Sequence, residues 1–118
     1  MDTYPLTVGE IISWFRSKEN ALATLGIILA GVHERSGTDK PAAFADFDAA
    51  LGMGRIIVWV SGEIDLEVLR ISDGNNVLVR HEKVSNLDAP SLQDAFNEFV
   101  KSMKHPGNDW GSYEQIVN

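Results

Sequence analysis

The chain lacks cysteine and any long apolar segment. Its 118 residues include no cysteine, which excludes a disulfide framework and a zinc site built from thiolates. No apolar run approaches the roughly 18 residues that a transmembrane helix needs. The opening residues, MDTYPLTVGE, also lack the basic and apolar regions of a secretory signal. We therefore expect a cytoplasmic protein without disulfides.

Positive charge is also scarce. Ten lysine and arginine residues stand against 17 aspartate and glutamate residues, so the formal net charge is -7 at pH 7. This balance disfavours direct binding to nucleic acid and to anionic membranes, because both ligands require a basic surface. The excess of acid has two explanations. It serves solubility, or it faces a basic protein partner and speeds association with it.

A capping box marks the start of the first predicted helix. Thr7 and Glu10 have the spacing at which each side chain accepts a hydrogen bond from the backbone N–H of the other residue. Leu6 and Ile11 occupy the two positions of a hydrophobic staple, and Gly26 fits the position just after a helix. The apolar residues between these signals recur at helical spacing and predict a core-facing stripe: Ile11, Trp14, Phe15, Leu22 and Leu25.

Two strands are predicted after this helix. Residues 27–35 are rich in β-branched side chains and favour a strand, with a continuation of the helix as the alternative. Residues 42–49 alternate between two faces. One face carries Phe44, Asp46 and Asp48, and the other carries Ala43, Ala45, Phe47 and Ala49. Gly52 and Gly54 then predict a flexible connection around Met53.

Residues 55–83 predict three consecutive antiparallel strands. Gly62-Glu63 suits a two-residue type II′ loop, which requires glycine at its first position. This register places Trp59 opposite Leu66. It predicts a core face of Ile57, Trp59, Ile64, Leu66 and Val68, and an opposite face of Ile56, Val58, Val60, Asp65, Glu67 and Leu69. A slip of one residue would reverse the faces, so the assignment depends on the turn.

A second helix is predicted to begin near Asp88 or Ser91 and to stop at residues 105–107. Its apolar stripe comprises Leu92, Ala95, Phe96, Phe99, Val100 and Met103. The whole order predicts a single α+β domain with about five mostly antiparallel strands and an N-terminal and a C-terminal helix packed on one sheet face. We expect the domain core in residues 6–104 and a polar tail in residues 106–118, which docks on the domain, docks on a second copy or frays.

Motifs for catalysis and metal binding are missing. His33, His81 and His105 are far apart and form no metal-binding pattern, and no serine lies in a GxSxG elbow. We therefore expect no metal and no cofactor, and acyl-transfer catalysis is unsupported. The carboxylates Asp46, Asp48, Asp65 and Glu67 have three interpretations: an acid–base pair, a solvated face, or a binding surface. The predicted register supports the last, since it adds apolar residues to the same face: Phe44, Val58, Val60 and Leu69.

One segment and the helix after it resemble a known family. The segment is GRIIVWVSGEIDLEVLRISDGNNVLVRHEKVSN, and the helix is LQDAFNEFVKSM. The shared pattern is a strand ending VWxSGE (residues 58–63), a DxEV strand (65–68), a DG turn (73–74), a strand ending HE (77–82) and a C-terminal helix. In these features the chain resembles the TriTu immunity proteins of bacterial polymorphic toxin systems, and behind them the immunity proteins of contact-dependent inhibition. The resemblance covers most of residues 6–104.

The resemblance implies a non-enzymatic antidote that binds the C-terminal domain of a secreted toxin. It would block the active site or the substrate path of that toxin, and many such toxins are nucleases with basic surfaces. Separately, we expect a monomer or a weak homodimer. The candidate toxin contacts are Asp46, Asp48, Glu63, Asp65 and Glu67, with Trp59 expected in the core. The alternatives are a small ligand-binding or enzymatic α+β domain with a carboxylate site, and a purely structural homodimer.

Overall fold

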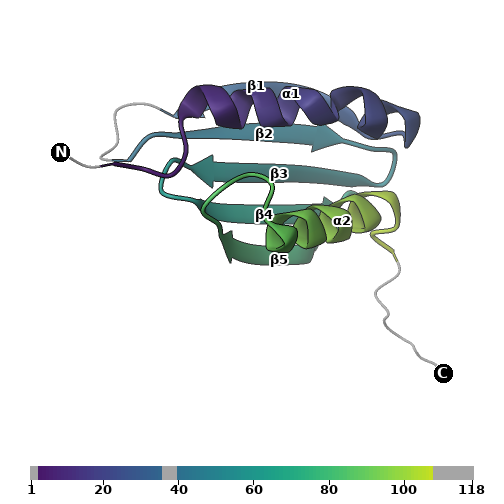
Figure 1. Cartoon of the computed structure of the whole chain (residues 1–118). Coiled ribbons are helices and arrows are strands. Elements are labelled where there is room, and N and C mark those ends of the chain that lie inside the picture. Colours follow the sequence, from purple (N-terminus) through teal and green to yellow (C-terminus); the bar gives the residue numbers. More distant parts are fainter. Residues whose placement is uncertain (1–2, 36–39, 108–118) are drawn as a thin grey trace.

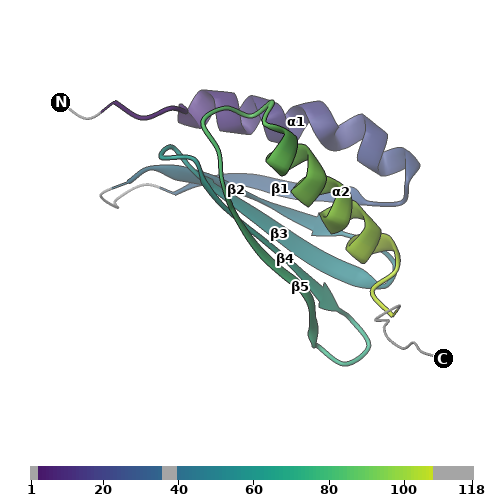
Figure 2. The ribbon, with the colours of Figure 1, turned by 60° about the horizontal axis from the view of Figure 1, so that its bottom comes forward.

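Five strands form one antiparallel sheet, and two helices lie on one side of it (Figure 1). The computed structural model describes residues 3–35 and 40–107. Its elements are α1 (Val8–Thr24), β1 (Ile28–Arg35), β2 (Ala42–Asp48), β3 (Gly52–Trp59), β4 (Glu63–Arg70), β5 (Asn76–Lys83) and α2 (Pro90–Lys104). The strands pair in chain order, each antiparallel to the next. Figure 2 shows both helices above the same sheet face, which confirms the predicted fold class.

The signals at both ends of α1 are confirmed. Thr7 Oγ1 accepts a hydrogen bond from the Glu10 N–H at 3.1 Å, and Glu10 Oε1 accepts one from the Thr7 N–H at 2.9 Å. Gly26 follows the helix with φ 81°, and the N–H of the residue after it donates to the Leu22 carbonyl at 3.0 Å. This bond closes the helix as a Schellman motif does. Leu25 caps the helix and is 42% exposed, so the prediction that it belongs to the core stripe is wrong.

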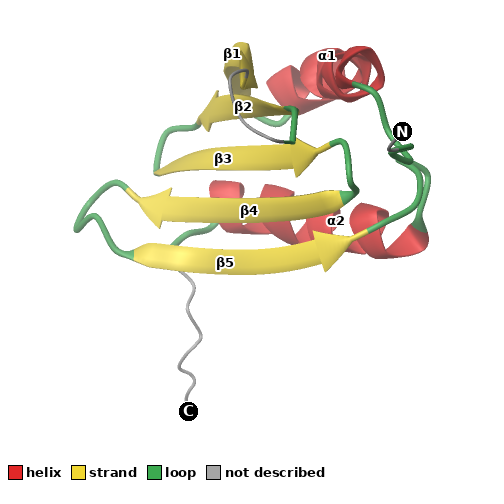
Figure 3. Cartoon of the chain, turned by 90° about the vertical axis from the view of Figure 1, so that its left-hand side faces the viewer, coloured by secondary structure: helices red, strands yellow, loops and turns green. Residues whose placement is uncertain are grey.

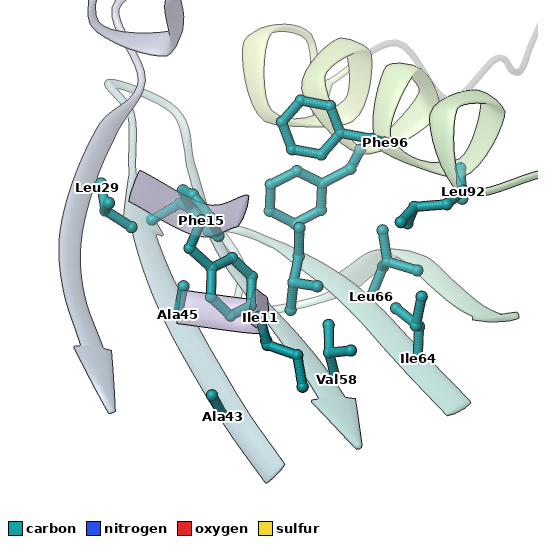
Figure 4. Close-up of a cluster of buried hydrophobic side chains, with 14 of the residues drawn as sticks. Ile11, Phe15, Leu29, Ala43, Ala45, Val58, Ile64, Leu66, Leu92 and Phe96 are labelled. Atoms are coloured by element: carbon teal, nitrogen blue, oxygen red, sulfur yellow. The ribbon is translucent and has the colours of Figure 1, made fainter. Parts of the chain in front are cut away.

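The core lies between the helices and the inner face of the sheet. Side chains from α1, from α2 and from alternate strand positions meet there (Figure 4). Three fully buried aromatic rings, Phe15, Phe47 and Phe99, link α1, β2 and α2 through edge-to-face contacts with centroids 5.2 to 6.5 Å apart. No polar or charged side chain is buried among residues 3–35 and 40–107. The inner face is therefore dry, and polar chemistry on the sheet is confined to its other face and its edges.

The register of the central hairpin differs from the prediction. β3 ends at Trp59 and β4 begins at Glu63, so the loop has three residues, with Gly62 last and at φ 96°. The Gly62 N–H donates to the Trp59 carbonyl at 2.8 Å, as in a tight turn followed by a left-handed glycine. The register pairs Ile56 with Leu66 and Val58 with Ile64.

This register reverses the two faces of β3. Ile56, Val58 and Val60 are buried, whereas Ile57 and Trp59 are only partly buried and lie on the side away from the helices. The prediction was therefore wrong for β3 and right for β4, where Ile64, Leu66 and Val68 are fully buried. The physical reason is the loop. Gly62 fits both the predicted two-residue loop and the observed three-residue loop, and these loops give strand registers that differ by an odd number of residues. An odd shift moves each β3 side chain to the other face of the sheet.

Gly52 and Gly54 belong to β3 and do not form a flexible connection. A Cβ at Gly54 would lie 2.6 Å from Phe99 Cζ and 2.8 Å from Met103 Sδ, both on α2. A Cβ at Gly52 would lie 3.2 Å from the Met103 carbonyl oxygen. The two glycines therefore let α2 approach the sheet closely.

Candidate functional site

The sheet face opposite the helices is covered by no element of the described part of the chain. Figure 3 shows the sheet with α2 behind β4 and β5. We call the part of this surface that β2 to β5 form the open face, and its residues are Phe44, Asp46, Asp48, Met53, Arg55, Ile57, Trp59, Glu63, Asp65, Glu67, Leu69, Val79, His81 and Lys83. It combines charged side chains with aromatic and aliphatic ones.

Three carboxylates form a row along β4, and we call Glu63, Asp65 and Glu67 the β4 acid row. They alternate with residues that are fully buried on the inner face, so the pleat of the strand turns all three toward the open face. Successive members are about 6.7 Å apart along the strand, because a strand rises about 3.3 Å per residue. The sequence predicted this outward placement for Asp65 and Glu67, whereas it placed Glu63 in the hairpin turn and not in β4.

An arginine lies between two strands of acids at the centre of the open face. Arg55 donates to both carboxylate oxygens of Asp46, from Nε at 2.6 Å and from Nη2 at 3.2 Å. Its guanidinium stacks 4.5 Å from the Phe44 ring centroid, and Glu67 is its register partner on β4. The hydrogen bond to Asp46 raises the pKa of Arg55. Asp46 is therefore partly neutralised within the protein.

The other end of the β4 acid row contacts two cationic or titratable side chains. Lys40, just before β2, pairs with Glu63, and its Nζ lies 6.0 Å from the centroid of the Trp59 ring. The hydrogen bond from Lys40 lowers the pKa of Glu63. Asp65 pairs with His81 of β5, whose side chain is 84% exposed. A hollow opens beside these groups and is lined by Trp59, Glu63, Asp65, His81, Glu82 and Lys83.

The structure places all five predicted contact residues on the open face. Asp46, Glu63 and Asp65 form ion pairs there, with Arg55, Lys40 and His81 respectively. Asp48 and Glu67 make no ion pair with any residue of 3–35 and 40–107 and are exposed. Asp48 lies at the far end of β2 from the hollow, beside Met53 of β3.

Sequence reasoning missed the apolar residues at the centre of the open face. Val58 and Val60 were predicted there, but Ile57 and Trp59 take their places, with Phe44 beside Ile57. Phe44 and Leu69 lie on this face as predicted, and Leu69 pairs with Met53. A three-residue loop with glycine last would have identified them. The sequence of β3 could not, since residues 56–60 are apolar without interruption and show no alternation.

The site is suited to charge pairing and to contact with a surface. Among residues 3–35 and 40–107, no group of three or more histidine, cysteine, aspartate or glutamate side chains could hold a metal ion. Asp65 and His81 are a carboxylate–imidazole pair, but the imidazole stands out into solvent. Water therefore reaches this pair freely, unlike the water-excluded groups of a closed active site.

A family model described as Immunity protein TriTu matches residues 9–102. The chain belongs to the TriTu immunity protein family. The matched region runs from the first turn of α1 to the last turn of α2, so it includes every strand that displays the open face. A search of curated proteins finds no match.

Membership of the TriTu family assigns an immunity role to this chain, and the partner that this role implies is a cognate toxin protein. The role is that of an inhibitor, which agrees with the absence of a catalytic motif noted above. None of the helices in the described part of the chain is both long and apolar enough to span a membrane.

Proposed function

We propose that this TriTu-family protein neutralises a nuclease toxin by laying its open face over the basic surface that binds nucleic acid. The observation that supports this proposal is the β4 acid row, three carboxylates displayed in line on an uncovered sheet face. A nuclease binds phosphates through lysine and arginine side chains. A row of carboxylates presents negative charges at regular intervals, as the phosphates of nucleic acid do. It therefore competes with the nucleic acid for the basic surface of the toxin.

The apolar side chains of the open face supply the second part of the interface. Ile57, Trp59 and Leu69 lie among the acids, and Val79 is 70% exposed on the neighbouring strand. Apolar and aromatic groups that exclude water at the centre of an interface carry most of the binding free energy, and a charged rim gives specificity. The open face has both kinds of residue within four strands.

The ion pairs already present on the open face favour selective binding. Arg55 and Lys40 each neutralise one acid, so the surface is a pattern of both signs and not a uniform field. A partner must match that pattern, because like charges placed opposite each other cost several kcal/mol, roughly, at an interface. We place this activity in the cytoplasm, where a nuclease toxin would meet its substrate.

The test is co-expression with the cognate toxin domain. The variant Asp65→Lys/Glu67→Lys reverses two members of the β4 acid row, and we expect it to lose protection and to bind the toxin domain about 100-fold more weakly or worse. Its free energy of unfolding should stay within about 1 kcal/mol of the parent, because both side chains lie at the surface. Growth curves, calorimetric titration and urea denaturation measure these three quantities.

A matched control carries the same change of charge elsewhere. Glu19→Lys/Asp88→Lys alters two exposed or partly exposed acids, on α1 and in the loop before α2, outside the open face. This control should still protect. Equal loss of protection in both variants, or none in either, would contradict the open face as the binding surface. A purified toxin domain that cleaves neither DNA nor RNA would contradict the nuclease assignment.

A further inference from the structure

We propose that Trp59, Glu63 and Asp65 form a seat for an arginine side chain of the toxin, and that Lys40 holds this position in the free protein. The inference rests on the proposed function, since the arginine belongs to the toxin. It goes further in naming the chemical group that the site receives. It also predicts that one of the protein's own residues competes with the partner.

The resident cation identifies the class of ligand. The ammonium of Lys40 lies over the Trp59 ring, 6.0 Å from its centroid, and pairs with Glu63. The segment that carries Lys40 is held in place, because the next residue's carbonyl, that of Pro41, accepts a hydrogen bond from the Val60 N–H at 3.1 Å. An aromatic face and a carboxylate therefore already bind one positive charge together, as a cation–π site does.

The space beside the resident cation is open. The hollow on this part of the sheet is lined by Trp59 and by both carboxylates of the seat. The Asp65 side chain is 28% exposed, and its partner His81 is 84% exposed. Glu82 and Lys83 line the same hollow with opposite charges. Lys83 is also the register partner of Glu63, but the ammonium paired with Glu63 and lying over the Trp59 ring is that of Lys40.

Arginine fits this arrangement better than lysine. A guanidinium is flat, so it can stack on the indole ring while its several N–H groups donate to both carboxylates. Arg55 already shows this geometry elsewhere on the open face, stacked on Phe44 and bonded to both oxygens of Asp46. A lysine ammonium is a point charge without a flat face, so it matches the ring and two separate carboxylates less well.

The direct test uses small probes and needs no toxin. The chain contains three tryptophans, so its indole N–H signals in a nitrogen-15 NMR spectrum are few, and the signal lost in Trp59→Phe belongs to Trp59. We expect N-acetyl-arginine amide to shift this signal at millimolar concentrations. N-acetyl-lysine amide should shift it less, and N-acetyl-citrulline amide, which is neutral and nearly the same shape, should leave it in place.

Two variants of Lys40 provide opposite expectations. Lys40→Ala removes the resident cation, so the arginine probe and the toxin domain should bind about two- to five-fold more tightly. Lys40→Arg places a guanidinium next to Trp59 and Glu63, where it competes more strongly for the site. The arginine probe and the toxin domain should therefore bind this variant more weakly, by a similar factor. Thermal melting of each variant checks that the fold is kept. The proposal is overturned if both variants change the affinity for the arginine probe in the same direction. It is also overturned if the citrulline probe shifts the Trp59 signal as much as the arginine probe does, or if the arginine probe does not shift this signal in Lys40→Ala.

The outcomes separate this proposal from the proposed function. If Asp65→Lys/Glu67→Lys still protects cells, the open face is not the toxin-binding surface, whatever the probes do. If that variant loses protection but the Lys40 variants bind the toxin as the parent does, the open face stands and the arginine seat alone fails.

Discussion

Gly62 is the residue on which the orientation of the open face depends. Its φ of 96° lies in the left-handed region, and a Cβ there would lie 2.0 Å from the Val84 carbonyl oxygen. Its own carbonyl accepts a hydrogen bond from the Val84 N–H at 2.9 Å. Gly62 is therefore required both by its backbone conformation and by the close approach of the chain after β5. The turn that it closes sets the register that turns Trp59 outward.

We predict that Gly62→Ala destabilises the protein far more than Gly74→Ala. Both glycines have positive φ, but a Cβ at Gly74 would meet no atom within 4 Å. Gly74→Ala should therefore cost only the conformational strain, about 1 to 2 kcal/mol. Gly62→Ala adds a clash with backbone and should cost about 3 kcal/mol or more. Urea denaturation measures both, and equal losses would show that the contact with residue 84 is unimportant.

At the scale of elements, the contact between α2 and β3 keeps the inner face dry. Phe99 and Met103 of α2 lie directly over Gly54, and both side chains are fully buried. At the edge of this layer, Arg80 of β5 donates to Glu98 of α2 at 2.7 Å, and hydrogen bonds to carboxylates raise the pKa of this arginine. Close packing on Gly54 and the ion pair with Arg80 therefore both fix α2 on the inner face of the sheet. The opposite face carries no helix.

We expect Gly54→Ala to destabilise the protein by about 1 to 3 kcal/mol, because the added methyl group overpacks a filled core. Gly9→Ala in the first turn of α1 is the matched control. Its Cβ would have only one neighbour, at 4.0 Å, so the better helix propensity of alanine should stabilise by up to about 1 kcal/mol. Thermal and urea unfolding measure both variants. A loss at Gly9 as large as that at Gly54 would point to a general intolerance of added volume.

For the whole molecule, the net charge of -7 acts over a longer range than any contact. An acidic protein that approaches a basic toxin is steered by the summed field, which speeds association and is screened by salt. If the open face binds the toxin as we propose, its mixed charges act only on contact, where they set the lifetime of the complex. The two effects therefore appear in different rate constants.

We predict that the rate constant for association with the toxin domain falls about ten-fold or more between about 0.01 M and 1 M salt. The reason is that the Debye length shrinks from about 30 Å to 3 Å. At low salt, Asp65→Lys/Glu67→Lys and Glu19→Lys/Asp88→Lys should slow association to a similar extent, since they change the net charge equally. Only the first variant should speed dissociation. Surface plasmon resonance measures both constants, and an association rate indifferent to salt would argue against electrostatic steering.

Local patterns in the sequence were enough for most of the fold and for part of the site. The capping box at Thr7 and the glycine at residue 26 each act within one turn of helix, so their outcome depends on neighbours in the chain. The alternation of acids and apolar residues along β4 likewise has one solution once the apolar side is buried. These features were enough to predict the fold class and the outward placement of Asp65 and Glu67.

The sequence by itself determined the order of elements, both ends of α1 and the outward side chains of Asp65 and Glu67 on β4, because short-range sterics and burial decide them. Only the tertiary structure decided which side of β3 faces solvent, since residues 56–60 are apolar throughout and either side could be buried. The same holds for Lys40, 23 positions from Glu63, which the pairing of β2 with β3 brings to Trp59. Both features depend on pairing between strands that are distant in the sequence, so no local sequence pattern predicts them.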